Sequence, residues 1–143
     1  YAPGTGKETL WRGDPSGSFT SSPGRSVSGR YVPVVGDFDA DGGDDVYWYG
    51  VGTAADALWI SAPGDPTSFT SVPARAVNGV FRPAVGDFDG NGSDDVYWYA
   101  PGTGADYLWR GSPSGPAPGP SVMQINGTYQ LLPGDFDGDG RVD

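Results

Sequence analysis

The sequence contains no cysteine and no histidine, and glutamate occurs once, at Glu8. The first two absences exclude disulfides, thiol chemistry and the commonest general base. No stretch of 18 apolar residues is present, so we expect no membrane-spanning helix. The eight basic residues form no stripe along the chain, which argues against a nucleic-acid partner.

Glycine and proline are abundant, with 25 and 14 of the 143 residues. Taken alone, this excess is typical of disorder. Aromatic residues make up 13% of the chain, however, and they recur at fixed spacing, which favours folded β structure. The length fits one modest domain over residues 1–143.

The sequence repeats itself every 48–50 residues. The motif at Gly36 returns at Gly86 and at Gly134, and DDVYWYGVGTAADALWI from Asp44 aligns with DDVYWYAPGTGADYLWR from Asp94. Such a period indicates a supersecondary unit that buries its apolar face by stacking on its neighbours. We divide the chain into blade-like repeats at 1–35 (incomplete), 36–85, 86–133 and 134–143 (incomplete).

Each repeat is predicted to hold four short antiparallel strands, because aromatic and β-branched runs alternate with Gly, Pro, Asp and Ser clusters. The first strand enters an Asp-rich loop (31–38, 81–88, 129–136), the second leaves it (46–49, 96–99), the third carries Leu-Trp (10–11, 58–59, 108–109), and the fourth reads Ser-Phe-Thr-Ser (18–21, 68–71). Four strands in about 40–50 residues make one blade of a β-propeller. We therefore predict an all-β fold of about three four-stranded blades with circularly permuted ends. The proline-rich segment from Ser112 predicts a short or irregular last edge.

The three Asp-rich loops place side-chain oxygens at positions 1, 3, 5 and 9, counted from the first aspartate, and a main-chain carbonyl at position 7. The expected ligands are Asp37, Asp39, Asp41, Gly43 and Asp45; Asp87, Asp89, Asn91, Ser93 and Asp95; and Asp135, Asp137, Asp139, Arg141 and Asp143. Carboxylates at this density repel one another unless a hard cation lies between them, and Ca²⁺ accepts six to eight oxygens. We therefore expect up to three Ca²⁺ ions, one in each loop and structural in role. Asn91 lowers the charge of the second site, which predicts that it is the weakest.

Two other interpretations of the loops are weaker. An EF-hand requires a bidentate glutamate at position 12, where Trp48 and Trp98 stand instead. Asp and Gly also favour simple polar turns, but three copies in one register disfavour that reading. Asp44 and Asp94, at position 8, are expected to point to solvent. Three divalent cations would change the net charge from −10 to −4.

The Asp-x-Asp-x-(Asp/Asn)-Gly-x-x-Asp loop between the first and second strands resembles the FG-GAP/VCBS repeat of integrin-α-like, calcium-binding β-propellers. The resemblance covers essentially the whole chain. It implies a non-catalytic binding or adhesion scaffold, secreted or at the cell surface, whose partner is an extracellular protein or a glycan. Known propellers have about four to eight blades. We therefore expect either part of a longer propeller or a homo-oligomer that completes the ring, such as two chains with six blades.

Few carboxylates remain for catalysis, because the three loops hold 13 of the 18 acidic residues. Asp56 and Asp106 occupy equivalent repeat positions, as expected of turn residues, so we predict no enzymatic activity. The tryptophans allow two interpretations. They form the core, which we favour, or they line inter-blade sites of a carbohydrate-binding lectin. The candidate ligand-binding residues in the second case are Trp11, Arg12, Trp59, Trp109 and Arg110.

Overall fold

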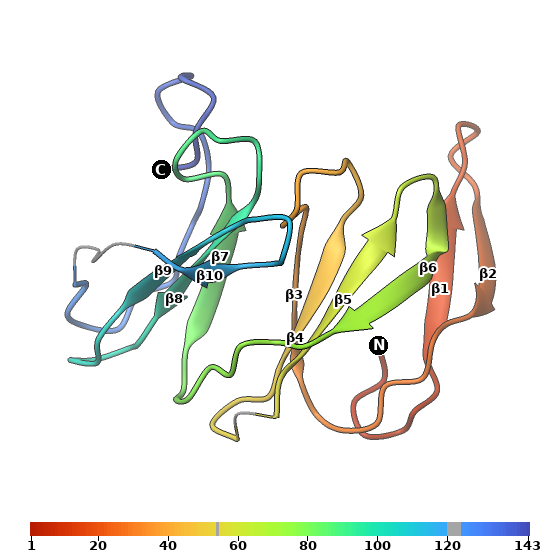
Figure 1. The fold of residues 1–143 in the computed structure, drawn as a ribbon, viewed down its shortest axis with the longest axis horizontal. Coiled ribbons are helices and arrows are strands. Elements are labelled where there is room, and N and C mark those ends of the chain that lie inside the picture. The colour runs from red at the N-terminus through yellow and green to blue at the C-terminus, as the bar shows by residue number, and fades with distance from the viewer. Residues whose placement is uncertain (54, 120–123) are drawn as a thin grey trace. The chain divides into compact units, whose positions relative to one another are not determined.

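The computed structural model describes residues 1–53, 55–119 and 124–143, and the chain divides into two compact units, Tyr1–Tyr31 and Val32–Asp143. The described residues form ten strands in three antiparallel sheets and no helix (Figure 1). The all-β prediction is therefore confirmed. A helix long and apolar enough to span a bilayer is likewise not found in this part of the chain.

The unit Tyr1–Tyr31 contains one hairpin of β1 (Thr9–Gly13) and β2 (Phe19–Pro23). Its turn is closed by Asp14, whose Oδ1 accepts a hydrogen bond of 2.7 Å from the Ser16 amide, as aspartate commonly does in turns. The two strands match the predicted third and fourth strands of a repeat.

The unit Val32–Asp143 contains two four-stranded sheets in which consecutive strands are neighbours. The strands of the first are β3 (Val32–Gly36), β4 (Asp45–Tyr49), β5 (Ala57–Ala62) and β6 (Asp65–Val72), and those of the second are β7 (Arg82–Gly86), β8 (Asp95–Tyr99), β9 (Tyr107–Arg110) and β10 (Ala117–Pro118). Gly36 lies opposite Asp45, and Gly86 lies opposite Asp95. The two repeats therefore share one register, and each sheet holds the four predicted strands.

The last edge strand is short, as predicted from its prolines. β10 has only two residues, because proline has no amide hydrogen to donate to a sheet ladder. Residues 120–122 of the same proline-rich segment lie outside the described residues.

The predicted strand at 129–136 is wrong, because these residues form no strand. The equivalent strands β3 and β7 pair with the strand that leaves their own loop. No strand of the described residues pairs with 129–136.

A single aromatic core joins the two four-stranded sheets. Its edge-to-face contacts include Tyr47 against Trp98, with ring centroids 5.6 Å apart, and Tyr49 against Trp98 at 5.1 Å. This geometry is favourable for aromatic pairs. The buried members of the cluster are Val34, Phe38, Tyr47, Tyr49, Leu58, Val77, Val96, Trp98 and Trp109. The core interpretation of the YWY strands is thus confirmed for the side chains in this cluster.

Candidate metal centres

The first aspartate of each loop folds the loop around its own carboxylate. Asp37 accepts hydrogen bonds from the amides of Asp41 (3.1 Å) and Gly42 (3.0 Å). Asp87 and Asp135 accept the equivalent position-6 bonds from Gly92 and Gly140, at 2.8 and 3.0 Å. One side chain therefore determines the same backbone path in all three copies.

The position 5 side chain closes the second half of the loop. Oδ1 of Asp41 accepts from the amide of Gly43 at 2.9 Å, and Oδ1 of Asn91 accepts from the amide of Ser93 at 2.7 Å. Asp139 accepts from Arg141 at 2.8 Å. Aspartate and asparagine therefore perform the same backbone role at this position.

A left-handed backbone at positions 4 and 6 makes the loop compact. Position 6 is always glycine, with φ of 90° at Gly42, Gly92 and Gly140. Position 4 is glycine in the second and third loops, but it is Ala40 in the first, with φ of 61°. Ala40 is the only non-glycine residue with positive φ among the described residues, and a Cβ in this region carries a steric cost.

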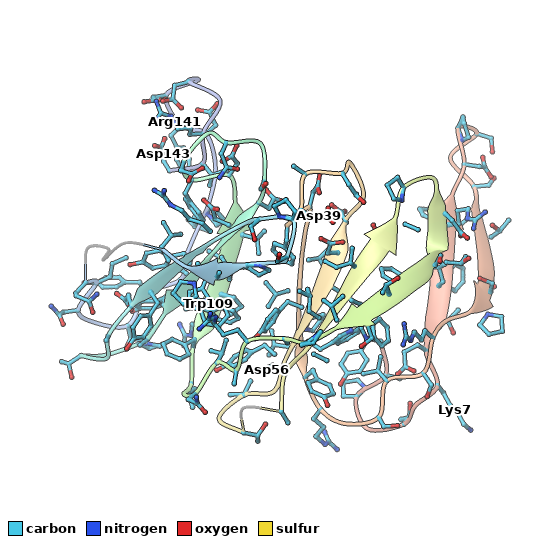
Figure 2. All side chains as sticks on the ribbon, in the orientation of Figure 1. Lys7, Asp39, Asp56, Trp109, Arg141 and Asp143 are labelled. Atoms are coloured by element: carbon cyan, nitrogen blue, oxygen red, sulfur yellow. The ribbon has the colours of Figure 1, made fainter. Side chains whose placement is uncertain are left out.

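Each loop brings three carboxylates together. The grouped residues are Asp37, Asp39 and Asp41; Asp87, Asp89 and Asp95; and Asp135, Asp137 and Asp143. In each group one oxygen per residue lies within 4.8 Å of the others. Calcium binds oxygen at 2.3–2.6 Å, so oxygens at this separation fit around one ion. Figure 2 shows Asp39 in the first loop and Asp143 in the third.

Position 9 is the most deeply buried carboxylate of the first two loops. Asp45 and Asp95 are fully buried, and each accepts an amide bond from the loop phenylalanine and one from the third strand or the residue after it. Burial raises the pKa of Asp45 to about 6, and the Asp39 carboxylate adds to the rise. Burial also raises the pKa of Asp95. A nearby cation would offset this cost of burying negative charge.

The first loop differs from the other two at position 9. Asp95 and Asp143 belong to the carboxylate groups of their loops, whereas the first group contains position 5, Asp41, and not Asp45. Both oxygens of Asp45 accept hydrogen bonds from amides, of Phe38 at 3.2 Å and Ser61 at 2.9 Å, as both oxygens of Asp95 do, so these bonds do not account for the difference. Nine of the twelve predicted side-chain ligands belong to the three carboxylate groups. Asn91 and Asp139, which do not, order the backbone of the second and third loops.

Two arginines lie against predicted ligands. Nε of Arg110 is 3.1 Å from Oδ2 of Asp89, and Nε of Arg141 is 3.1 Å from Oδ2 of Asp139. Arg141 was expected to contribute only its carbonyl. The contact of Arg110 was not foreseen, because it joins β9 to a loop at a distant point in the sequence. The only sequence signal for this contact was a difference between repeats: the middle repeat has Ile60 where the other two have Arg12 and Arg110.

The expectation that Asp94 points to solvent is wrong. Oδ2 of Asp94 accepts a hydrogen bond of 3.0 Å from the amide of Asp37 in the preceding loop. The same position of the first loop, Asp44, is exposed as expected. In the second loop, position 8 therefore contacts the preceding loop.

The five candidate ligand-binding residues lie on three separate strands. Trp11 and Arg12 are exposed on β1. Trp59 packs edge-on against Trp48, with centroids 5.2 Å apart, and buried Trp109 packs against Trp98 at 5.5 Å. Arg110 is engaged by Asp89. Within the unit Val32–Asp143, Trp59 belongs to the first sheet, and Trp109 and Arg110 belong to the second.

Carboxylates outside the loops tie backbone segments together. Asp56 accepts from the amides of Gly50 at 2.7 Å and Val77 at 2.6 Å, and Asp106 accepts from Ala100 at 2.7 Å and Ile125 at 2.6 Å. Figure 2 labels Asp56 at the end of the first sheet away from Asp39. These contacts agree with the prediction that both are turn residues.

An aromatic cavity of about 320 Å³ adjoins the second sheet. Its walls include Phe81, Trp98, Tyr107 and Trp109, together with the polar residue Asn78. The indole Nε1 of Trp98 is buried and has no hydrogen-bond partner among the described residues. The cavity thus presents aromatic faces and one polar side chain, that of Asn78.

No model of a known protein family, no curated protein sequence and no solved structure matches this chain.

Proposed function

We propose that this chain is a calcium-stabilised binding scaffold built of β-propeller blades of the FG-GAP/VCBS type. The observation that carries the proposal is the recurrence of three carboxylate groups in loops with one common backbone geometry. Aspartate and amide oxygens, supplemented by carbonyls, are ligands that suit calcium. Three equivalent loops also argue against chance clustering of acidic residues.

The cation has a structural role in this proposal. The first two loops join β3 to β4 and β7 to β8, so an ion within each would fasten two paired strands at one end. Binding that occurs only in the folded state adds its free energy to stability. No cysteine is present to form disulfides, so bound calcium would take their place in cross-linking the strands.

The partner class follows from the same family resemblance. We propose that the scaffold acts outside the cell, secreted or at the cell surface, and binds an extracellular protein or a glycan. No catalytic role is assigned, since Asp56 and Asp106 are occupied with backbone amides.

The direct test is thermal unfolding in calcium, in magnesium and in EDTA, with calcium binding measured by calorimetry. At free calcium 100 times the Kd, each site adds about 2.7 kcal/mol, and a domain of this size gains about 2–4 °C in Tm per kcal/mol. We expect calcium to raise the Tm by roughly 5 °C or more per site. The Asp87→Asn variant should lose part of this gain, whereas Asp14→Asn, in an exposed turn outside the loops, should keep it. An unchanged Tm in EDTA would overturn the proposal.

A second candidate function is carbohydrate binding by a lectin. It is favoured by the aromatic cavity beside Trp109, because aromatic faces with a polar residue beside them suit a sugar ring. A glycan panel read by tryptophan fluorescence tests it, with Trp109→Phe as the site variant and Trp11→Phe, on a different strand, as the control. Quenching that Trp109→Phe removes and Trp11→Phe leaves would support a lectin, and silence across the panel would reject it.

A further inference from the structure

The second loop holds the first loop by the main chain of Asp37. The Asp94 amide donates to the Asp37 carbonyl at 2.8 Å, and the Asp37 amide donates to Oδ2 of Asp94 at 3.0 Å. The two residues are 57 positions apart in the sequence and belong to the same compact unit. Asp94 thus binds both main-chain groups of a residue in another loop.

Close packing surrounds this pair of hydrogen bonds. A Cβ at Gly36 would lie 2.8 Å from Oδ2 of Asp94 and 2.7 Å from the Val85 side chain. Any side chain at Gly36 would therefore push the two loops apart. The contact requires glycine at the residue that precedes Asp37.

A second close approach connects the same two loops at Gly111. A Cβ at Gly111 would overlap the Asp94 carbonyl oxygen and lie 2.9 Å from the carbonyl oxygen of Phe38. The Gly111 amide donates to Oδ1 of Asp95 at 2.9 Å. Gly111 therefore lies against both loops and also binds a carboxylate of the second.

Both sides of the contact belong to predicted calcium ligands or lie next to them. Asp37 is position 1 of the first loop and a member of its carboxylate group. Asp94 directly precedes Asp95, which is position 9 of the second loop and a member of that group. Asp94 itself belongs to neither group. The contact therefore joins the backbones of ligands from two different centres.

A reduced form of the contact joins the third loop to the second. The Val142 amide donates to the Asp87 carbonyl at 2.9 Å, and a Cβ at Gly86 would lie 2.6 Å from the Val142 side chain. Val142 precedes a position 9 ligand, Asp143, just as Asp94 precedes Asp95. Valine has no carboxylate, however, so it cannot accept the second hydrogen bond.

We propose that the contact between Asp94 and Asp37 couples the first two metal centres, so that calcium in one loop raises the calcium affinity of the other. This inference rests on the calcium role in the proposed function and adds its regulation. An ion in the first loop would hold the Asp37 side chain, and an ion in the second would hold Asp95. Ordering one side of the contact in advance reduces the entropy that binding at the other side must remove.

Electrostatic repulsion between the ions acts in the opposite direction. An ion in one loop weakens the negative potential that attracts an ion to the next. Salt screens this effect over about 8 Å at 0.15 M and over shorter distances at higher concentration. Hydrogen bonds in a packed junction are screened much less, so the coupling should persist, and increase, as the salt concentration rises from about 0.1 to 0.5 M.

A calcium titration of the full chain followed by NMR of the backbone amides measures each loop separately. The amides of Gly42 and Gly92 donate to the position 1 carboxylates of their own loops, so their resonances report binding in the first and second loops. Asp89→Asn removes a carboxylate from the second loop. Coupled sites commonly change each other's affinity by about 5–150-fold, so we expect the Gly42 midpoint to rise about fivefold or more in Asp89→Asn. An unchanged midpoint would overturn the proposal.

The reverse titration must give the same factor, because coupling between two binding sites is reciprocal. Asp39→Asn weakens the first loop, and the Gly92 midpoint should rise by the same factor within about twofold. A shift in one direction only would overturn the coupling. Neither variant changes Asp94 or the main chain of Asp37.

Two substitutions at Asp94 test the contact itself. Asp94→Ala removes the side-chain acceptor, and with it the Gly42 shift caused by Asp89→Asn should shrink to about twofold or less. Asp94→Asn keeps an acceptor oxygen without the charge and should retain the full shift. A full shift in Asp94→Ala, or its loss in Asp94→Asn, would overturn the assignment to this hydrogen bond.

The third loop supplies an internal comparison. Asp137→Asn weakens that loop, whose contact with the second has one hydrogen bond in place of two. The Gly92 midpoint should therefore rise less in Asp137→Asn than in Asp39→Asn. An equal or larger rise would overturn the role of the Asp94 side chain.

A matched control changes position 8 of the first loop. Asp44 is exposed, and Asp44→Ala should leave the coupling as it is in the parent. Circular dichroism checks the fold of each variant, and the titrations of Asp89→Asn and Asp39→Asn decide the question even where Asp94→Ala does not fold. The same titrations separate the two proposals. Independent midpoints would overturn only the coupling, whereas no calcium-dependent shift at Gly42 or Gly92 would overturn the proposed function and the coupling with it.

Discussion

The hydroxyl of Tyr49 donates a hydrogen bond of 2.6 Å to the carbonyl of Gly79 and accepts one of 2.9 Å from the amide of Phe81. The bonds tie the end of β4 to the segment that enters β7. The pattern recurs between Tyr99, Gly127 and Tyr129, and between Tyr1, Gly29 and Tyr31. The last tyrosine of each YWY sequence therefore holds a main-chain turn as well as filling the core.

Replacing this hydroxyl should lower the free energy of unfolding most where the hydroxyl is buried. Tyr49→Phe leaves a carbonyl and an amide without their partner, and we expect a loss of about 1–3 kcal/mol in the free energy of unfolding. Urea denaturation followed by circular dichroism measures it. Tyr1→Phe removes the equivalent hydroxyl at an exposed position, where water replaces it, and should cost less than about 0.5 kcal/mol. Equal losses in the two variants would contradict this account.

The left-handed backbone at Ala40 predicts a stabilising substitution. Ala40→Gly removes a Cβ from a position with φ of 61°, and the relief exceeds the entropic cost of glycine by up to about 1 kcal/mol. Gly42→Ala, with φ of 90° and open space around the added Cβ, should destabilise the protein by about 1 kcal/mol. Both are read from urea unfolding without calcium. A loss of stability in Ala40→Gly would show that this strain is absent.

Repeat periodicity predicted which residues are equivalent, and hence the four strands of each sheet, the loops and the short β10. It did not predict which of the equivalent residues are buried by a neighbouring repeat. Phe38 and Phe136 occupy the same loop position, yet one is 0% and the other 76% exposed, because burial depends on the repeat that follows.

Contacts between loops and distant parts of the chain could not be predicted from the sequence either. Whether Arg110 reaches Asp89, or Asp94 reaches Asp37, depends on how strands from different sheet positions align. The residue types alone are compatible with solvent exposure in both cases. By contrast, the carboxylate groups were predictable, because the loop residues are close in sequence and their order fixes the local geometry.

The ion pair of Arg110 predicts that this side chain competes with calcium for the second loop. Removing it in Arg110→Gln frees Asp89, and since exposed ion pairs contribute about 0.2–1 kcal/mol, we expect calcium affinity to rise by up to about fivefold. Arg12→Gln changes the same repeat position on β1 and serves as the control. Terbium luminescence titration reports the affinity, and an affinity that falls in Arg110→Gln would contradict the competition.

The uncharged side chain of Asn91 predicts that the second loop binds calcium more weakly than the other two. Asn91→Asp adds a carboxylate where Asp41 and Asp139 stand in the other loops, and since Asp41 accepts the same amide bond, the backbone should not change. Affinity depends on ligand charge, so we expect calcium to bind the second loop several-fold more tightly. Calorimetry on both proteins measures the difference, with Asp65→Asn as an acidic control outside the loops. Equal affinities would show that position 5 does not contact the ion.

Stability should fall in alkaline solution because of the buried tyrosines. Burial, followed by the Asp106 carboxylate, raises the pKa of Tyr97 to about 12, and burial also raises the pKa of Tyr47 and of Tyr49. A tyrosine whose pKa is higher in the folded than in the unfolded chain stabilises the fold below pH about 10, and this contribution is lost as the pH rises toward 12.

The Tm measured at several pH values from about 9 to 11 should therefore decrease, and tyrosinate absorbance should appear together with unfolding. Tyr97→Phe removes one titrating group and should flatten the decrease. Tyr107→Phe, at an exposed ring on the neighbouring strand, should leave the slope as it is. The same slope in Tyr97→Phe as in the parent would assign the alkaline loss to other groups.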